Sequence, residues 1–158
     1  MTPRDTQRAK VYAAEEFVRT LFDRATERGN RVVDFFGTQL TLPPEGRFGS
    51  VAAVQRYVDE VLAHVGADRP LMVRARRGVT AAHYERLDDD ATIAVPDGRS
   101  TWALRELVVL HEIAHHLSDA EPPHGPDFVA TFCGLAEAVM GAEVAYVLRV
   151  VYAKEGVR

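Results

Sequence analysis

The stretch that best predicts the fold is residues 102–117, with the sequence WALRELVVLHEIAHHL. Leucine and valine occupy nearly every side of this segment when it is drawn as a helix, which is typical of a helix buried at the centre of a domain. Ionisable side chains are unfavourable in such a helix, because burying a polar group without a partner costs about 1–3 kcal/mol. His111, Glu112 and His115 nevertheless lie together inside it.

The spacing of these three residues fits one metal ion. Residues four apart lie on one face of a helix, so the imidazoles of His111 and His115 can bind the same tetrahedral ion. The pattern H-E-x-x-H is that of zinc hydrolases, in which the glutamate acts on the water at the metal. The sequence therefore predicts Zn²⁺ as the cofactor, His111 and His115 as ligands and Glu112 as the catalytic residue.

A catalytic zinc site usually has three protein ligands and one open position, and His124 is the predicted third ligand. It follows the turn-forming residues 118–123 and precedes Pro126, where a new helix is expected to begin, so that it can fold back over the first helix. Three histidines would also suit iron, cobalt or nickel. Three acidic residues are the alternatives for the third ligand: Glu137, Asp119 and Glu121.

Two segments resemble the catalytic core of SprT-type minimal zincins: His111-Glu112-x-x-His115 and His124-Gly125-x-x-Phe128. In that core a histidine in an H-G-x-x-aromatic segment completes the zinc site. The resemblance covers residues 102 to about 135 and implies a minimal zincin-like fold. The chain lacks the cysteine-rich zinc ribbon often appended to SprT-type proteins, so their DNA-linked role is not carried over.

More of the chain is similar to a family of small bacterial proteins of the H-E-x-x-H zincin type that are described only as metallohydrolases. That resemblance implies no particular substrate. Four segments carry it: Arg4-Asp5-x-Gln7-Arg8, Phe48-Gly49-Ser50, Arg74-Ala75-Arg76-Arg77-Gly78 and Trp102-Ala103-Leu104-Arg105-Glu106-Leu107.

The predicted ligand set favours metal-assisted hydrolysis of an amide, most directly a bond in a peptide or protein substrate. Zinc held by three imidazoles lowers the pKa of its water toward about 7, and Glu112 can accept the proton and pass it to the leaving amine. The alternatives are a zinc hydrolase of a non-peptide amide or ester, and a non-catalytic zincin-like binding or regulatory module. Four residues are candidates for stabilising the oxyanion: Tyr84, His83, Tyr146 and Arg149.

The composition favours a single zincin-like domain spanning residues 1–158, with 47% hydrophobic residues and no internal repeat. A net charge of −4 does not indicate a surface that binds nucleic acid. Arg74, Arg76 and Arg77 are expected on the solvated face and at the end of a strand. No apolar run is long enough to span a bilayer. The lone Cys133 is expected to be a buried packing thiol in a cytoplasmic protein. The oligomeric state stays open.

Hydrophobic periodicity predicts an α+β domain in which a small sheet packs against the H-E-x-x-H helix and flanking helices. Gly29 and Gly66 are expected to end two helices, and Ser50 to cap the second. The expected helices cover residues 5–28, 51–65, 102–117 and 143–152, together with one that begins at Pro126. The expected strands cover residues 32–36, 39–42, 71–76, 81–86 and 92–95, and an extended substrate is expected to pair with the edge of the last.

Overall fold

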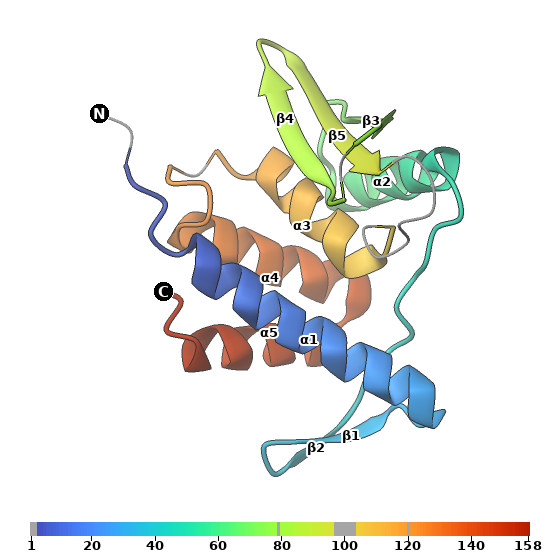
Figure 1. The fold of residues 1–158 in the computed structure, drawn as a ribbon, viewed down its shortest axis with the longest axis vertical. Coiled ribbons are helices and arrows are strands. Elements are labelled where there is room, and N and C mark those ends of the chain that lie inside the picture. Colours follow the sequence, from blue (N-terminus) through green and yellow to red (C-terminus); the bar gives the residue numbers. More distant parts are fainter. Residues whose placement is uncertain (1–2, 79, 97–103, 120) are drawn as a thin grey trace. The chain divides into compact units, whose positions relative to one another are not determined.

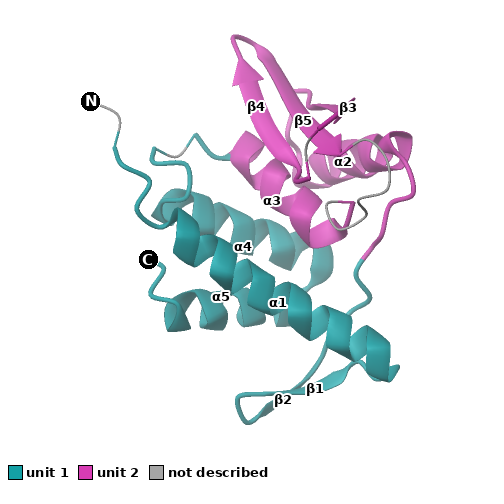
Figure 2. Cartoon of the chain, viewed as in Figure 1, with its two compact units in different colours: residues 1–45, 118–158 teal, residues 46–117 magenta. Residues whose placement is uncertain are grey.

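The computed structural model describes residues 3–78, 80–96, 104–119 and 121–158, and the prediction of an α+β fold is confirmed. The described residues form five helices and two small sheets (Figure 1). They divide into two compact units (Figure 2), of which the first contains residues 1–45 and 118–158 and the second contains residues 46–117. In this part of the chain, none of the helices combines the length and the apolar character needed to cross a bilayer.

The first unit is built from three helices and a β-hairpin. Helix α5 packs against both α1 and α4. Because α1 and α5 come from opposite ends of the sequence, the core of this unit joins residues far apart in the chain. The elements are α1 (Arg8–Arg28), β1 (Val32–Phe35), β2 (Thr38–Thr41), α4 (Pro126–Met140) and α5 (Ala142–Lys154).

Two local predictions for the first unit needed small corrections. Helix α1 begins at Arg8 rather than at residue 5, although it ends as predicted at Gly29, whose φ is +65°. The hairpin turn is Phe36-Gly37, one residue earlier than expected, because Phe35 pairs with Thr38. A two-residue hairpin turn of this kind needs left-handed backbone, and the φ of Phe36 is +48°.

The second unit contains a three-stranded sheet and two helices. The chain forms α2 as predicted, because the Ser50 side chain accepts a hydrogen bond from the Ala53 N–H and Gly66 ends the helix with φ +72°. Within this unit α2 contacts β3, α3 contacts β4, and the two helices contact each other (Figure 1). The elements are α2 (Val51–Val65), β3 (Met72–Arg76), β4 (His83–Leu87), β5 (Asp90–Pro96) and α3 (Glu106–Leu117).

The strand order is β3-β5-β4, so β5 lies in the middle of the sheet. It pairs in parallel with β3 and antiparallel with β4. The predicted substrate-binding edge at residues 92–95 is therefore wrong, because both edges of β5 already bind neighbouring strands. The edge strands of this sheet are β3 and β4.

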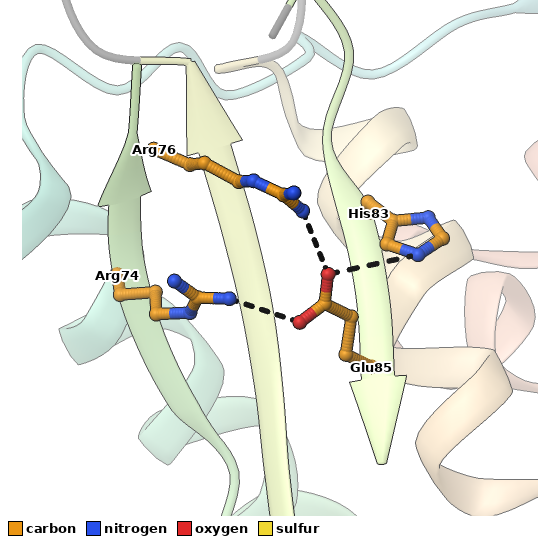
Figure 3. Close-up of polar contacts among 4 residues, drawn as sticks. All are labelled: Arg74, Arg76, His83 and Glu85. Atoms are coloured by element: carbon orange, nitrogen blue, oxygen red, sulfur yellow. Dashed lines mark hydrogen bonds and ion pairs between the residues drawn. The ribbon is translucent and has the colours of Figure 1, made fainter. Parts of the chain in front are cut away.

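Charged side chains cover the face of this sheet that lies away from α2 and α3 (Figure 3). Glu85 of β4 accepts hydrogen bonds from Arg74 at 2.9 Å and from Arg76 at 2.8 Å, both on β3. The hydrogen bond from Arg74 is the largest cause of a lowered pKa at Glu85. Both arginines are about half exposed, with side-chain exposures of 51% and 47%. The prediction that they lie on a solvated strand face is confirmed.

Candidate metal centre

The helix that carries the H-E-x-x-H pattern is anchored at its first residue. The Glu106 N–H donates to the Gly46 carbonyl at 2.9 Å, and the Glu106 carboxylate accepts hydrogen bonds from the Gly46 N–H and the Tyr57 hydroxyl. Just before it, Leu104 and Arg105 pair with the extended chain near Phe48. Helix α3 therefore begins at Glu106; Trp102 and Ala103, included in the predicted helix, lie outside the described residues.

The rings of His111 and His115 meet on one face of α3. Their Nε2 atoms lie 3.2 Å apart, and the ring planes are inclined by 72°. Two nitrogens at about 2.05 Å from one tetrahedral zinc ion lie about 3.3 Å apart. The spacing of this histidine pair therefore fits two ligands of a single ion.

Glu112 follows His111 directly and is also buried, with 8% of its surface exposed. One residue of α-helix is a rotation of about 100°, so its carboxylate lies beside the histidine face of the helix and not on it. Carboxylates are almost never this buried without a partner. Glu112 therefore belongs to the interior surroundings of the histidine pair and is not a solvated surface glutamate.

His116 is the most buried polar residue near the pair, with 1% exposure. Its Nε2 lies 2.9 Å from the Arg69 carbonyl oxygen, which can only accept, so Nε2 carries the ring proton. Nδ1 of the neutral ring then accepts from the Tyr84 hydroxyl at 3.1 Å. Both ring nitrogens of His116 are therefore hydrogen-bonded within the second unit.

The same contact brings Tyr84 of β4 to the face of α3 that carries His111 and His115. Its ring stacks on the ring of His115, with centroids 6.2 Å apart and planes inclined by 14°. Of the four candidates for oxyanion stabilisation, Tyr84 is the one that contacts a predicted ligand within its own unit. His83 lies on the exposed sheet face near Glu85, and Arg149 pairs with Glu137 at 3.4 Å.

His124 lies in the first unit, just before α4, and is 5% exposed. Its Nδ1 is 2.8 Å from Oδ2 of Asp5, and its backbone N–H donates to Oδ1 of the same carboxylate at 3.3 Å. Tyr12 and Phe128 contact the ring edge to face, at centroid distances of 5.2 Å and 5.3 Å. Because a carboxylate can only accept, Nδ1 carries the ring proton and Nε2 is the nitrogen left to bind a metal.

The acidic alternatives for the third ligand are all at the surface. Glu137 lies on the exposed face of α4, where it pairs with Arg149. Asp119 and Glu121 are exposed residues of the connection between α3 and α4. Exposed carboxylates are common without a metal, whereas His124 offers a buried imidazole, so the donor chemistry favours His124.

Sequence reasoning missed Asp5 as the partner of His124. Asp127 and Asp119 carry carboxylates much closer to His124 in sequence, whereas Asp5 lies 119 positions away. No spacing rule links two residues at that separation. The one available signal is the segment Arg4-Asp5-x-Gln7-Arg8, which is part of the resemblance to the metallohydrolase family.

Comparison with known proteins yields no relative: no protein-family model, curated protein or solved structure matches this chain.

Proposed function

We propose that this protein is a zinc-dependent hydrolase, and most directly a metallopeptidase that cleaves amide bonds. In this proposal His111, His115 and His124 hold Zn²⁺, and Glu112 is the general base. The observation that carries the proposal is the 3.2 Å separation of the Nε2 atoms of His111 and His115, with a buried glutamate between them in sequence.

The donor chemistry supports a three-histidine site, because neutral imidazoles are standard zinc ligands and three of them leave the fourth position open. Nothing in this set distinguishes zinc from iron, cobalt or nickel, so the choice of zinc follows from the H-E-x-x-H pattern.

When bound, a zinc ion would lower the pKa of its water to about 7 and polarise the substrate carbonyl. The side chains of the protein would transfer the proton and stabilise the charge that develops in the reaction. The Glu112 carboxylate accepts the proton of the attacking water and later donates it to the nitrogen of the leaving amine. Tyr84, stacked on His115, is the proposed hydrogen-bond donor to the developing oxyanion, and its single hydroxyl proton would then turn from Nδ1 of His116 to that oxygen.

The proposed substrate is a peptide or protein segment in extended form. Strand β4 is an edge of its sheet and carries Tyr84, so an extended chain pairing with β4 would lie near His115. Nucleic acid and membrane are not among the proposed partners, given the net charge of −4. The proposed compartment is the cytoplasm, because the lone cysteine is free and buried, which suits a reducing environment.

The decisive test is the metal content of protein purified without chelator and without a metal-affinity resin. Mass spectrometry should find about one zinc per wild-type chain and strongly reduced zinc in His124→Ala. A matched control is His83→Ala, which removes an exposed histidine of β4 that lies on the opposite sheet face from Tyr84. This control should retain its zinc.

The other outcomes of this measurement separate the alternatives. Zinc retained in His124→Ala would move the third ligand to Glu137 or a neighbouring carboxylate. No metal in the wild-type protein would overturn the hydrolase proposal and favour a non-catalytic binding or regulatory module. With zinc present, a screen of peptide libraries against small amides and esters would separate a peptidase from a hydrolase of non-peptide substrates.

A further inference from the structure

The segment that precedes α1 makes an unusual set of contacts with the predicted third ligand. Asp5 uses both carboxylate oxygens on His124, one on the ring and one on the backbone N–H. Gln7 donates from Nε2 to the His124 carbonyl at 3.1 Å. The ring Nδ1, the backbone N–H and the carbonyl of His124 are thus all bonded by Asp5 and Gln7.

From these contacts we propose that Asp5 is a positioning residue for the metal site, which holds His124 in the one tautomer and ring orientation that present Nε2 to the ion. This inference rests on the proposed function, because it takes His124 to be a ligand. Asp5 acts only through the imidazole and touches neither metal nor substrate.

The geometry explains why a carboxylate is suited to this task. The side chain of His124 is 7% exposed and that of Asp5 is 23% exposed, so the contact is largely shielded from water and its hydrogen bond is little weakened by solvent. A proton fixed on Nδ1 leaves the lone pair on Nε2, and the nearby negative charge makes that lone pair a stronger metal donor. Tyr12 and Phe128 restrict the ring further by contacting it edge to face.

The placement of Asp5 depends in turn on Gln7. The Gln7 side chain also binds residue 158, donating to its carbonyl at 3.0 Å and accepting from its backbone N–H at 2.7 Å. Gln7 is the residue immediately before α1, and its carbonyl accepts the Val11 N–H at 2.9 Å. The carboxylate that orients His124 is therefore attached to a segment held by α1 and by the opposite end of the described chain.

The test compares zinc affinity, measured by competition with a chromogenic chelator, in the wild type and three variants. Removing an outer carboxylate partner of a ligand histidine typically costs 10- to 100-fold in metal affinity, and we expect this loss in Asp5→Ala. Asp5→Asn should lose less, because its amide oxygen can still accept the Nδ1 proton. Asp127→Ala is the matched control: it removes an exposed carboxylate near His124 in sequence and should bind zinc like the wild type.

A spectroscopic measurement distinguishes positioning from a general structural role. In the zinc-loaded wild type, ¹⁵N NMR shifts of the His124 ring should report metal at Nε2 and a proton at Nδ1. Metal at Nδ1 would overturn the inference, and so would wild-type zinc affinity in Asp5→Ala. Wild-type protein that binds no zinc would instead refute the proposed function.

Discussion

The Tyr84 hydroxyl and Nδ1 of His116 lie 3.1 Å apart, and this contact joins an edge strand to the helix that carries the histidine pair. His116 is buried and its other ring nitrogen is bound to the Arg69 carbonyl. The Arg69 carbonyl therefore fixes the tautomer of His116, and the hydroxyl contact holds the tyrosine ring against His115.

We expect Tyr84→Phe to lower kcat with little change in zinc content. The phenylalanine ring keeps the stacking on His115 but removes the hydroxyl proposed to stabilise the oxyanion, a group of the kind worth about 10²- to 10³-fold in kcat. Unfolding in urea should also show a loss of about 1 kcal/mol from the missing hydrogen bond to His116. Tyr146→Phe, which alters an exposed tyrosine of α5, is the control. Unchanged kcat in Tyr84→Phe would remove Tyr84 from the proposed chemistry.

Glu112→Gln should bind zinc as the wild type does and lose hydrolytic activity. Glutamine is nearly the same size as glutamate but cannot accept the proton of the attacking water, and general-base catalysis contributes about 10²- to 10⁴-fold. The measurement is kcat/KM on a peptide substrate together with the zinc content of each preparation. Glu137→Gln serves as the control, because this glutamate is exposed on α4. Full activity in zinc-loaded Glu112→Gln would exclude the assignment of Glu112 as the base.

The thiol of Cys133 should be unreactive in the folded protein. Cys133 is 2% exposed, which confirms the prediction of a buried thiol, and burial raises its pKa to about 11. At pH 8 a disulfide reagent such as dithionitrobenzoate should label it only after denaturation. Prompt labelling of the native protein would contradict this burial.

The same shift makes stability depend on alkaline pH. Between about pH 9 and about pH 11 the unfolded chain loses the thiol proton while the folded chain retains it, so the contribution of Cys133 to stability is complete below this window and falls as pH rises through it. Urea unfolding at several alkaline pH values should show this decline, and Cys133→Ala should lack the part caused by the thiol.

Glu85→Gln should change the free energy of unfolding only slightly. Glu85 pairs with Arg74 and Arg76 on a solvated sheet face, where ion pairs contribute little and are screened by salt (Figure 3). The arginines make the pKa of Glu85 lower in the folded protein than in the unfolded chain. The ion pairs therefore contribute their full stability above the pKa of the unfolded glutamate, and this contribution is lost as pH falls through the pKa of the folded state. A difference from wild type that is large at neutral pH or insensitive to salt would contradict this view.

Features set by neighbours in sequence were predictable. Ser50 and Gly66 bound α2 as expected, because a helix cap depends on three or four consecutive residues. The convergence of His111 and His115 follows in the same way from the 3.6-residue turn of α3. The helical form of α5 was likewise predicted from the spacing of Val144, Leu148 and neighbouring apolar residues.

Features set by packing were not predictable. The central position of β5 depends on β3 crossing over to pair with it, which the pattern of strand residues does not encode. The choice of Asp5 as partner of His124 depends on the packing of α1 and α5 in one unit.

The sequence by itself determined the helix, the spacing of its two histidines and the donor chemistry, because backbone periodicity and side-chain type act over a few residues. Only the tertiary structure decided which distant groups complete the surroundings of each histidine: Tyr84 beside His115 and Asp5 beside His124. Such contacts form when the apolar faces of helices and strands are buried together. The same hydrophobic pattern is compatible with many arrangements of these elements, and only the packing of the whole chain selects one of them.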